Sequence, residues 1–177
     1  MEESIIAELI VADREQLLDK LMDKYGESLL HLTYSYVKDR TVAEDLTQEI
    51  FVKCYQRLGQ YESRSTLKSW LWRIAINHCK DYLRSWHHKH IFVAEDQVKK
   101  TSSIEKDVEN EVIQRYEDKQ LVEAVMSLPD RYREVIYFYY FEELSIKEIS
   151  SLTSVNQNTI KTRLKRAKEI LKECLEV

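Results

Sequence analysis

The sequence predicts an all-α protein in which two small helical domains, a three- or four-helix bundle and a helix-turn-helix unit, are joined by a flexible linker. The first reason is composition: the 177 residues include only 2 Gly and 1 Pro, the residues that tight turns and β-sheet loops consume. The second is that apolar residues recur three and four positions apart, the period of amphipathic helices. The third is that one polar central stretch lacks this period, so the helices fall into two groups.

The first group of helices is expected to form the bundle, over residues 10–88. Its first helix is predicted over 13–38. Leucine and tyrosine form the apolar stripe of this helix: Leu17, Leu18, Leu21, Tyr25, Leu29, Leu32 and Tyr36. The helical spacing of the stripe predicts one buried face.

Local signals at both ends define the second helix, over 42–58. Thr41 and Glu44 have the spacing of a capping box, in which each side chain bonds the backbone N–H of the other residue. Gly59 follows the helix, where a left-handed C-terminal cap is expected. A third helix of about 20 residues is then predicted from Thr66. The expected inner face of this third helix consists of Leu67, Trp70, Leu71, Ile74, His78 and Tyr82.

The linker is predicted over residues 89–111, where charged residues, Ser and Thr alternate without an apolar stripe. The second group of helices occupies 112–177. Its first helix ends at Pro129, the only proline, because proline cannot continue a helix. Asp130 is expected to cap the next helix. The apolar run of that next helix is Val135, Ile136, Phe138, Tyr139 and Phe141.

The last two helices have the arrangement of a helix-turn-helix unit. Ser145 and Glu148 form a second candidate capping box, which opens a short helix over 146–153. Three residues follow, and a longer helix begins at Gln157; short helix, tight turn and longer helix define this motif. Asn156 is a good N-cap. Beyond it, amide, hydroxyl and basic side chains are expected to point outward: Asn158, Thr159, Lys161, Thr162, Lys165 and Arg166.

Charge is distributed unevenly along the chain. The total of 27 Lys+Arg and 31 Asp+Glu gives a formal net charge of −4, which taken alone argues against a nucleic-acid binder. Residues 64–90, however, hold six basic residues and one acidic residue, and residues 149–177 hold six and three. These two basic segments coincide with the third and the last predicted helices. Each segment is either a solvated helix face or a surface for nucleic acid, or, for the last helix, for an acidic protein.

The third helix interleaves aromatic and basic residues, the combination that stacks on bases and holds the backbone of single-stranded nucleic acid. Trp70 and Tyr82 lie on its inner stripe and are more simply explained as core. Trp72 and Asn77 lie off that stripe and are better candidates for contact with nucleic acid.

Several classes of protein are excluded or disfavoured by missing signals. The three cysteines, Cys54, Cys79 and Cys174, are too far apart for a Cys-x-x-Cys site and odd in number, so a reducing compartment is expected. There is no Gly-rich phosphate loop, no nucleophile–base pair and no apolar run of about 18 residues. The sequence therefore predicts a cytoplasmic protein that is not an enzyme and has no cofactor or small-molecule substrate.

Three stretches resemble a known family: AEDLTQEIFVKCYQRL (43–58), STLKSWLWRIAINHCKDYLR (65–84) and LPDRYREVIYFYYFEELSIKEISSLTSVNQNTIKTRLKRAKEIL (128–171). The first two are similar to region 2, and the third to region 4, of bacterial σ70-family factors of the extracytoplasmic-function (ECF) type. The order and separation of the two regions are those of the family. The resemblance implies an alternative sigma factor that directs core RNA polymerase to specific promoters.

The resemblance also implies roles for individual residues. A polymerase-binding surface, facing the clamp helices of the β′ subunit, would comprise Glu44, Asp45, Gln48 and Glu49. Contacts to the melted −10 strand, including the capture of a flipped-out base by Asn77, would come from Tyr61, Ser63, Arg64, Ser65, Trp72, Asn77, Lys80 and Arg84. Contacts to the duplex −35 element would come from Asn156, Asn158, Thr159, Lys161, Thr162, Lys165 and Arg166. Further implied partners are the β flap and a membrane-anchored anti-sigma factor.

The sequence departs from the family pattern at a few positions. Ser154 stands where the family often has Gly in the turn of the helix-turn-helix. Gln157 and Asn158 replace smaller residues at the start of the recognition helix, which points to an unusual −35 preference. A metal site at His87, His88 and His90 would lack a recognised spacing, so these histidines are assigned to the polar end of the linker and no metal is expected.

Two other functions remain to be distinguished from the sigma factor. A helix-turn-helix repressor or activator, with an N-terminal bundle that senses a ligand or dimerises, would bind a palindromic operator without polymerase. An enzyme would need a nucleophile–base pair, a cluster of metal ligands or a phosphate loop, none of which the sequence shows. A purely protein-binding scaffold would leave the recognition helix unexplained.

Overall fold

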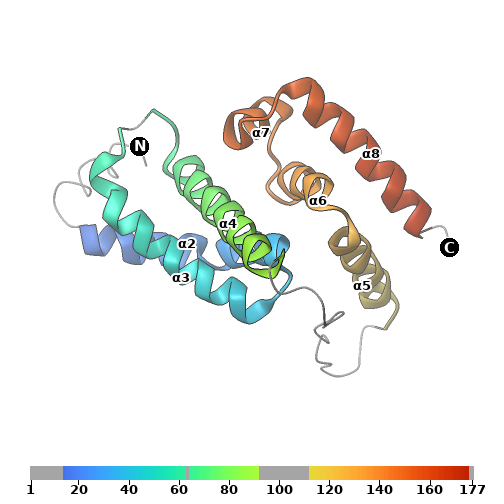
Figure 1. The fold of residues 1–177 in the computed structure, drawn as a ribbon, viewed down its shortest axis with the longest axis horizontal. Coiled ribbons are helices and arrows are strands. Elements are labelled where there is room, and N and C mark those ends of the chain that lie inside the picture. The colour runs from blue at the N-terminus through green and yellow to red at the C-terminus, as the bar shows by residue number, and fades with distance from the viewer. Residues whose placement is uncertain (1–13, 63, 92–111, 176–177) are drawn as a thin grey trace. The chain divides into compact units, whose positions relative to one another are not determined.

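A computed structural model describes residues 14–62, 64–91 and 112–175. Within these ranges the regular elements are helices, with no strand (Figure 1), so the predicted all-α class is confirmed. The chain divides into two compact units, Met1–Val93 and Ala94–Val177, called unit 1 and unit 2 below. No helix in the described part of the chain is long and apolar enough to cross a membrane.

Unit 1 is a bundle of three long helices. Helices α2 (Arg14–Val37) and α3 (Arg40–Arg57) pack side by side, and α4 (Leu67–Ile91) packs against both (Figure 1). Each helix contributes fully buried leucine or isoleucine to the shared core, such as Leu29, Ile50 and Leu71. The predicted first helix is confirmed, and α4 is longer than the predicted third helix.

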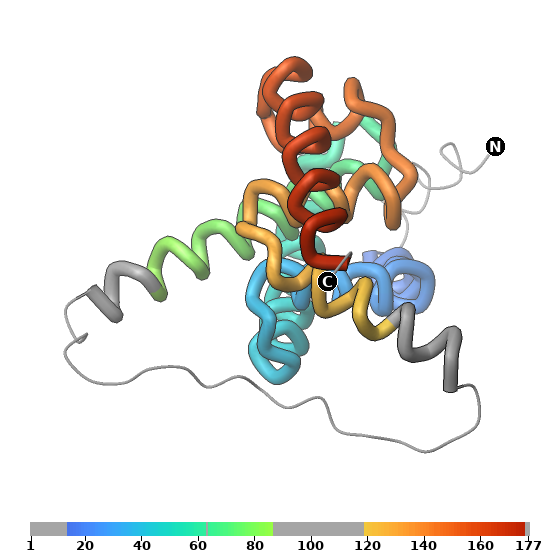
Figure 2. Tube along the Cα trace, turned by 90° about the vertical axis from the view of Figure 1, so that its right-hand side faces the viewer, coloured from blue at the N-terminus to red at the C-terminus, as the bar shows by residue number. Residues whose placement is uncertain are grey.

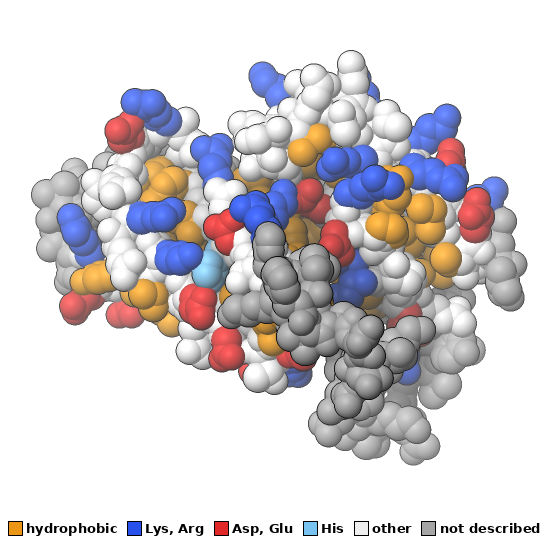
Figure 3. All heavy atoms as spheres, in the orientation of Figure 1, with side chains coloured by type: hydrophobic (Ala, Val, Ile, Leu, Met, Phe, Trp, Pro, Cys, Tyr) orange, Lys and Arg blue, Asp and Glu red, His pale blue; other side chains and the backbone are white. Residues whose placement is uncertain are grey.

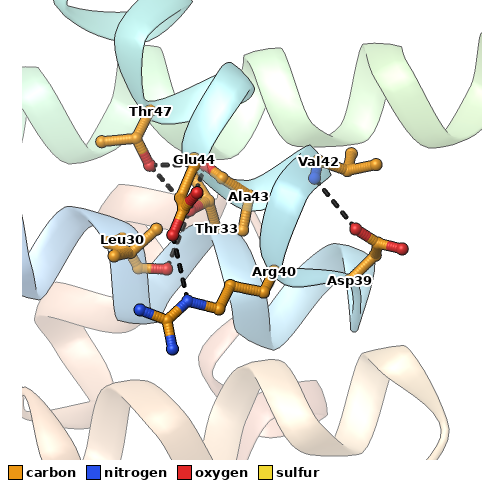
Figure 4. Close-up of polar contacts among 8 residues, drawn as sticks. All are labelled: Leu30, Thr33, Asp39, Arg40, Val42, Ala43, Glu44 and Thr47. Carbon is orange, nitrogen blue, oxygen red and sulfur yellow. Dashed lines mark hydrogen bonds and ion pairs between the residues drawn. The ribbon is translucent and has the colours of Figure 1, made fainter. Parts of the chain in front are cut away.

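The start of α3 differs from the prediction. Asp39 caps the helix, because its Oδ1 accepts a 3.0 Å hydrogen bond from the Val42 amide. The helix therefore begins at Arg40, and Glu44 lies one turn inside it, paired with Arg40 at 3.0 Å (Figure 4). The predicted capping box of Thr41 and Glu44 is wrong, since a competing cap two residues earlier satisfies the first turn.

A buried polar link joins α3 to α2 near this start. The Oγ1 of the fully buried Thr33 lies 2.9 Å from that of Thr47, so that one hydroxyl donates to the other (Figure 4). The accepting hydroxyl donates in turn to a backbone carbonyl, that of Leu30 for Thr33 or that of Ala43 for Thr47. Because buried hydroxyls are costly unless they are bonded, this link fixes how the two helices align.

The end of α3 also differs from the prediction. Gly59 lies in a 3-10 turn, η1 (Leu58–Gln60), and neither glycine of the chain has a positive φ, so the predicted left-handed cap is wrong. A Cβ at Gly59 would lie 2.8 Å from Nη2 of Arg14 on α2. Because Nη2 is the far end of a flexible, exposed side chain, which can move aside, neither this contact nor the backbone conformation requires glycine here.

Unit 2 contains α5 (Val112–Ser127), α6 (Asp130–Ile136), a π-helical turn η2 (Tyr137–Phe141), α7 (Ile146–Thr153) and α8 (Gln157–Leu175). Figures 1 and 2 show α8 lying against α5 and α6, with which it is in contact. Phe138, Ile149 and Ile160 are fully buried between these elements.

The turn between α5 and α6 is held by a buried arginine. The guanidinium of Arg133 donates to the Leu128 carbonyl at 2.7 Å and to Asp130 Oδ1 at 2.6 Å. Pro129 takes the N-cap position of α6, without a side-chain bond. The predicted cap at Asp130 is therefore wrong, because its carboxylate is engaged by Arg133.

The aromatic run after α6 is only partly buried. Phe138 is inaccessible, whereas Tyr139 is 38% and Phe141 59% exposed. A π turn takes more residues per turn than an α-helix, so the helical period that placed all three in one apolar run does not hold here.

Candidate nucleic-acid interface

The predicted helix-turn-helix is present in unit 2, and local hydrogen bonds define its first helix, α7. The Glu148 amide donates to Ser145 Oγ at 3.3 Å, and the Ser145 amide donates to Glu148 Oε2 at 2.8 Å. This is the predicted capping box, which is confirmed. The Ser145 hydroxyl also donates to Glu148 Oε2 at 2.6 Å, and this bond, with the bond from the Ser145 amide, lowers the pKa of Glu148.

Two residues shape the turn between α7 and α8, Ser154 through its backbone angles and Asn156 through its side chain. Ser154 has left-handed backbone angles, φ 59° and ψ 30°, the conformation for which glycine is favoured. Asn156 then accepts a 2.8 Å hydrogen bond at Oδ1 from the Asn158 amide, as expected of a residue that caps α8. Ile160 and Leu164 of α8 are buried, with Ile149 and Leu152 of α7. The packing of these residues fixes the two helices to each other.

The opposite arc of α8 faces solvent. All seven residues assigned to the −35 element are exposed: Asn156, Asn158, Thr159, Lys161, Thr162, Lys165 and Arg166. Lys and Arg side chains lie along this helix with hydrophobic groups beside them (Figure 3). Arg166 is paired with Glu169 at 3.0 Å, and this carboxylate raises the pKa of Arg166.

Two residues of α6 border this arc and escaped the sequence analysis. Arg131 and Tyr132 line the same surface hollow as Thr159, Thr162 and Arg166. The Arg131 guanidinium lies 4.8 Å from the centroid of the Tyr132 ring. No sequence motif marks Arg131, because it lies outside the two basic segments and borders α8 only through the packing of α6 on α8.

In unit 1, a polar row on α4 carries three of the eight candidate −10 residues. Asn77 and Arg84 are exposed and Lys80 is half-buried. Their spacing of three and four residues places them on one face, and exposed Arg73 extends the row by one turn. Arg84 is paired with Asp81 at 3.3 Å. The row is a continuous polar strip, which suits a phosphate backbone.

Trp72 does not belong to this surface. Its side chain is 1% exposed, with its ring 5.5 Å from that of Tyr25 in an edge-on arrangement and with Lys68 Nζ 5.1 Å from its centroid. A base could stack on Trp72 only if the bundle opened. Its geometry therefore gives no support to the assignment of Trp72 to −10 contact. Trp70 and Tyr82, the expected core residues, are only half-buried.

The loop before α4 is ordered by Tyr61. The Tyr61 hydroxyl donates to the Ser65 carbonyl at 2.5 Å, and its ring lies 5.4 Å from that of Trp70. Arg64 is exposed and pairs with Glu62 at 2.7 Å. Three of the four loop residues assigned to −10 contact therefore lie next to the start of α4: Tyr61, Arg64 and Ser65. The fourth, Ser63, lies outside the described residues.

The candidate polymerase-binding residues lie on one face of α3. Asp45, Gln48 and Glu49 are exposed and line a shallow hollow together with Val52, which is 55% exposed. Glu44 is half-buried and paired with Arg40. Val52 was missed by the sequence analysis, although its position three residues after Glu49 and four after Gln48 is the signal that could have found it.

Other candidate chemical groups are separate from these surfaces. Cys54 and Cys79 are buried, and burial raises the pKa of each thiol to about 12. Among the described residues, no group of three or more His, Cys, Asp or Glu side chains could hold a metal ion. The side chains of His87, His88 and His90 lie outside the described part.

These features define a class: a helix-turn-helix protein with a basic recognition helix and a separate helical bundle. Residues 21–88 match the family Sigma-70 region 2, and residues 118–171 match Sigma-70, region 4. The chain is 32% identical over 156 residues to the ECF RNA polymerase sigma factor SigM of Bacillus subtilis, covering 88% of this chain and 93% of the relative. It is 33% identical to the RNA polymerase sigma factor SigV of the same organism, covering 88% and 89%.

Solved structures agree on the fold. The sigma factor RpoE of Bartonella quintana, in complex with the anti-sigma factor NepR, has a TM-score of 0.74 at 21% identity, covering 90% of this chain and 96% of the other. CnrH, in complex with the cytosolic domain of CnrY, has a TM-score of 0.69 at 19% identity, covering 97% and 96%.

The chain belongs to the σ70 family of RNA polymerase sigma factors, in its ECF group. It is accordingly a factor for transcription initiation and not an enzyme. The predicted resemblance is confirmed, and the two competing functions, an operator-binding repressor and an enzyme, are set aside.

Proposed function

We propose that the two units divide promoter recognition between them. Unit 2, with the domain 112–177, would read the −35 duplex through α8. Unit 1, with the domain 10–88, would dock on the β′ clamp helices through α3 and hold the melted −10 strand on α4 and its preceding loop. The linker 89–111 would let each domain reach its own element, and region 4 would also contact the β flap.

The outward arc of α8 is the observation that carries this proposal. Every residue assigned to the −35 element is exposed, while Ile160, Leu164 and Ala167 on the other side are buried. Amide and hydroxyl groups on this arc can bond base edges, and Lys and Arg can bond phosphates. Arg131 is proposed as an additional phosphate contact.

The division of roles is tested by run-off transcription with purified core RNA polymerase on a promoter library. Replacing Lys161 and Arg166 together by Ala should lower initiation about tenfold or more, since one good base or phosphate contact contributes about 1–3 kcal/mol. On promoters with a scrambled −35 element, the double variant and the wild type should give equal transcript. Lys119→Ala, at an exposed lysine of α5, is the matched control and should leave initiation unchanged.

The −10 role of α4 is tested separately with Asn77→Ala. This variant should change the preferred −10 base while its affinity for core polymerase and its unfolding midpoint stay those of the wild type. Tight binding of the free protein to a palindromic duplex, with no polymerase-dependent transcript from the library, would refute the proposal as a whole.

An anti-sigma factor is proposed as the regulator, in a cytoplasmic setting and with a membrane anchor on the partner. Support comes from the fold shared with RpoE, whose structure holds the anti-sigma factor NepR. Tagged full-length protein, isolated from a membrane fraction of its own host, should retain a membrane-spanning partner that blocks run-off transcription. Recovery of an inhibitor without a membrane span would refute the anchor alone.

A further inference from the structure

One half-buried histidine joins α4 to the candidate polymerase-binding face of α3. The side chain of His78 is 11% exposed, and its Nε2 lies 2.6 Å from Glu49 Oε2 on α3. Its Nδ1 lies 2.7 Å from Lys53 Nζ, one turn further along α3. The imidazole therefore bridges an acidic and a basic side chain of the same helix face.

The partners of His78 determine its tautomer. An ammonium group only donates, so Nδ1 must accept from Lys53. A carboxylate only accepts, so Nε2 must carry the proton that Glu49 receives. The contacts thus require the neutral imidazole with hydrogen on Nε2. In this state both ring nitrogens have a hydrogen-bond partner.

The bridge acts on a carboxylate that is otherwise open to solvent. The Glu49 side chain is 60% exposed, and it lines the same hollow as Asp45, Gln48 and Lys53. An exposed glutamate normally samples several rotamers, and fixing it on binding costs free energy. Anchoring at His78 fixes Glu49 before any partner arrives.

We infer that His78 is a positioning residue of the polymerase-binding surface, which holds the Glu49 carboxylate and the Lys53 ammonium in the arrangement that core polymerase binds. This inference rests on the proposed docking role of α3. It concerns a residue of α4 that need not touch polymerase itself.

The test measures the affinity of the fluorescently labelled full-length chain for core RNA polymerase by anisotropy. His78→Leu removes both hydrogen bonds and should weaken binding about 2- to 12-fold for each long side chain that must then be ordered on association. His78→Gln keeps a donor and an acceptor and should remain within about twofold of the wild type. His31→Leu, the same substitution at an exposed histidine of α2, should change nothing.

A double-mutant cycle separates positioning from a general structural effect. In a Glu49→Ala background, His78→Leu should have a clearly smaller effect on affinity, because the group it positions is gone. Full additivity would overturn the inference. Wild-type affinity of His78→Leu, with weakened binding of Glu49→Ala, would overturn it too and leave the docking role intact. If Glu49→Ala and Asp45→Ala both bind like the wild type, the docking role itself fails.

A measurement on the unmodified protein covers the case in which His78→Leu does not fold. Long-range ¹H–¹⁵N correlation spectra at neutral pH should show the His78 ring protonated at Nε2 and unprotonated at Nδ1. The opposite tautomer, or an imidazolium, would contradict the bridge to Lys53 and overturn the inference.

Discussion

Replacing Ser154 by Gly should stabilise unit 2. Ser154 is the residue at which α7 ends, and its φ of 59° lies in the left-handed region. There the Cβ of an L-residue crowds the backbone, a crowding from which glycine is free. The turn itself is fixed by the packing of α7 on α8, so the substitution should keep its geometry and remove the strain.

The expected magnitude is the difference between two opposing effects. The left-handed conformation costs a non-glycine residue about 1–2 kcal/mol, which Gly would recover. Gly also makes the unfolded chain more flexible, which costs about 0.5–1 kcal/mol. The net gain in the free energy of unfolding is therefore centred on about 0.75 kcal/mol within a span of about 0–1.5 kcal/mol, which should slow amide exchange about three- to fourfold at positions that open only on unfolding.

Native-state hydrogen exchange at the buried positions Ile149 and Ile160 measures this gain in the full-length chain. The three tryptophans, Trp70, Trp72 and Trp86, all belong to unit 1, so their fluorescence unfolding curve should stay unchanged and serves as an internal control.

Ser151→Gly is the matched substitution, at an exposed position inside α7. It should destabilise unit 2 by about 0.5 kcal/mol, the difference in helix propensity between the two residues. Slower exchange in both variants, or faster exchange in Ser154→Gly, would refute the assignment of strain to residue 154.

Three further outcomes are expected. Trp72→Ala should lower the free energy of unfolding of unit 1 by about 3–5 kcal/mol, as for other large buried aromatics; unchanged urea unfolding with a loss of −10 recognition would contradict its burial. At pH 8 an aromatic disulfide reagent should label Cys174 alone in the native chain, and all three cysteines in urea, because a pKa of about 12 keeps Cys54 and Cys79 protonated; fast labelling of more than one thiol would show that the buried sites open. Arg131→Ala should weaken binding of the −35 duplex and reduce the salt dependence of binding by about one phosphate contact; an unchanged salt slope would remove Arg131 from the interface.

The helix-turn-helix could be predicted from the sequence because its signals are local. Ser145 and Glu148 are three residues apart, and the bonds between them depend on nothing outside one helical turn. The same holds for Asn156 and the Asn158 amide. These signals placed α7 at the bounds that the structure shows and placed the outward arc of α8 correctly.

The face of α4 could not be predicted in the same way, because it depends on the other helices. This helix packs against both α2 and α3, so its buried arc is wider than a single stripe. Leu71, Trp72, Ala75, Ile76 and Cys79 are all buried. A pattern that assumes one partner helix leaves Trp72 outside the core, whereas two partner helices enclose it.

Competition between caps explains the other difference in unit 1. Asp39 and Thr41 are both good N-cap residues, and the sequence contains a suitable glutamate only for Thr41. Lys38 has a positive φ after α2, and Asp39, the next residue, accepts the hydrogen bond from the Val42 amide. Which residue caps α3 therefore depends on the connection between α2 and α3, and the spacing of Thr41 and Glu44 carries no information about that connection.

The charge of the interface, like the cap of α3, cannot be predicted from sequence position alone. Salt screens exposed charges beyond about 8 Å, so a phosphate near α8 responds to the side chains around it and not to the net charge of −4. Counting charges by segment is also incomplete. Arg131 lies outside both basic segments yet borders the outward arc of α8, and Glu169 lies inside a basic segment yet pairs with Arg166. The electrostatics of the interface therefore follow from the packing of α6 on α8, which brings Arg131 to the arc, and from the ion pair of Arg166 and Glu169 within α8.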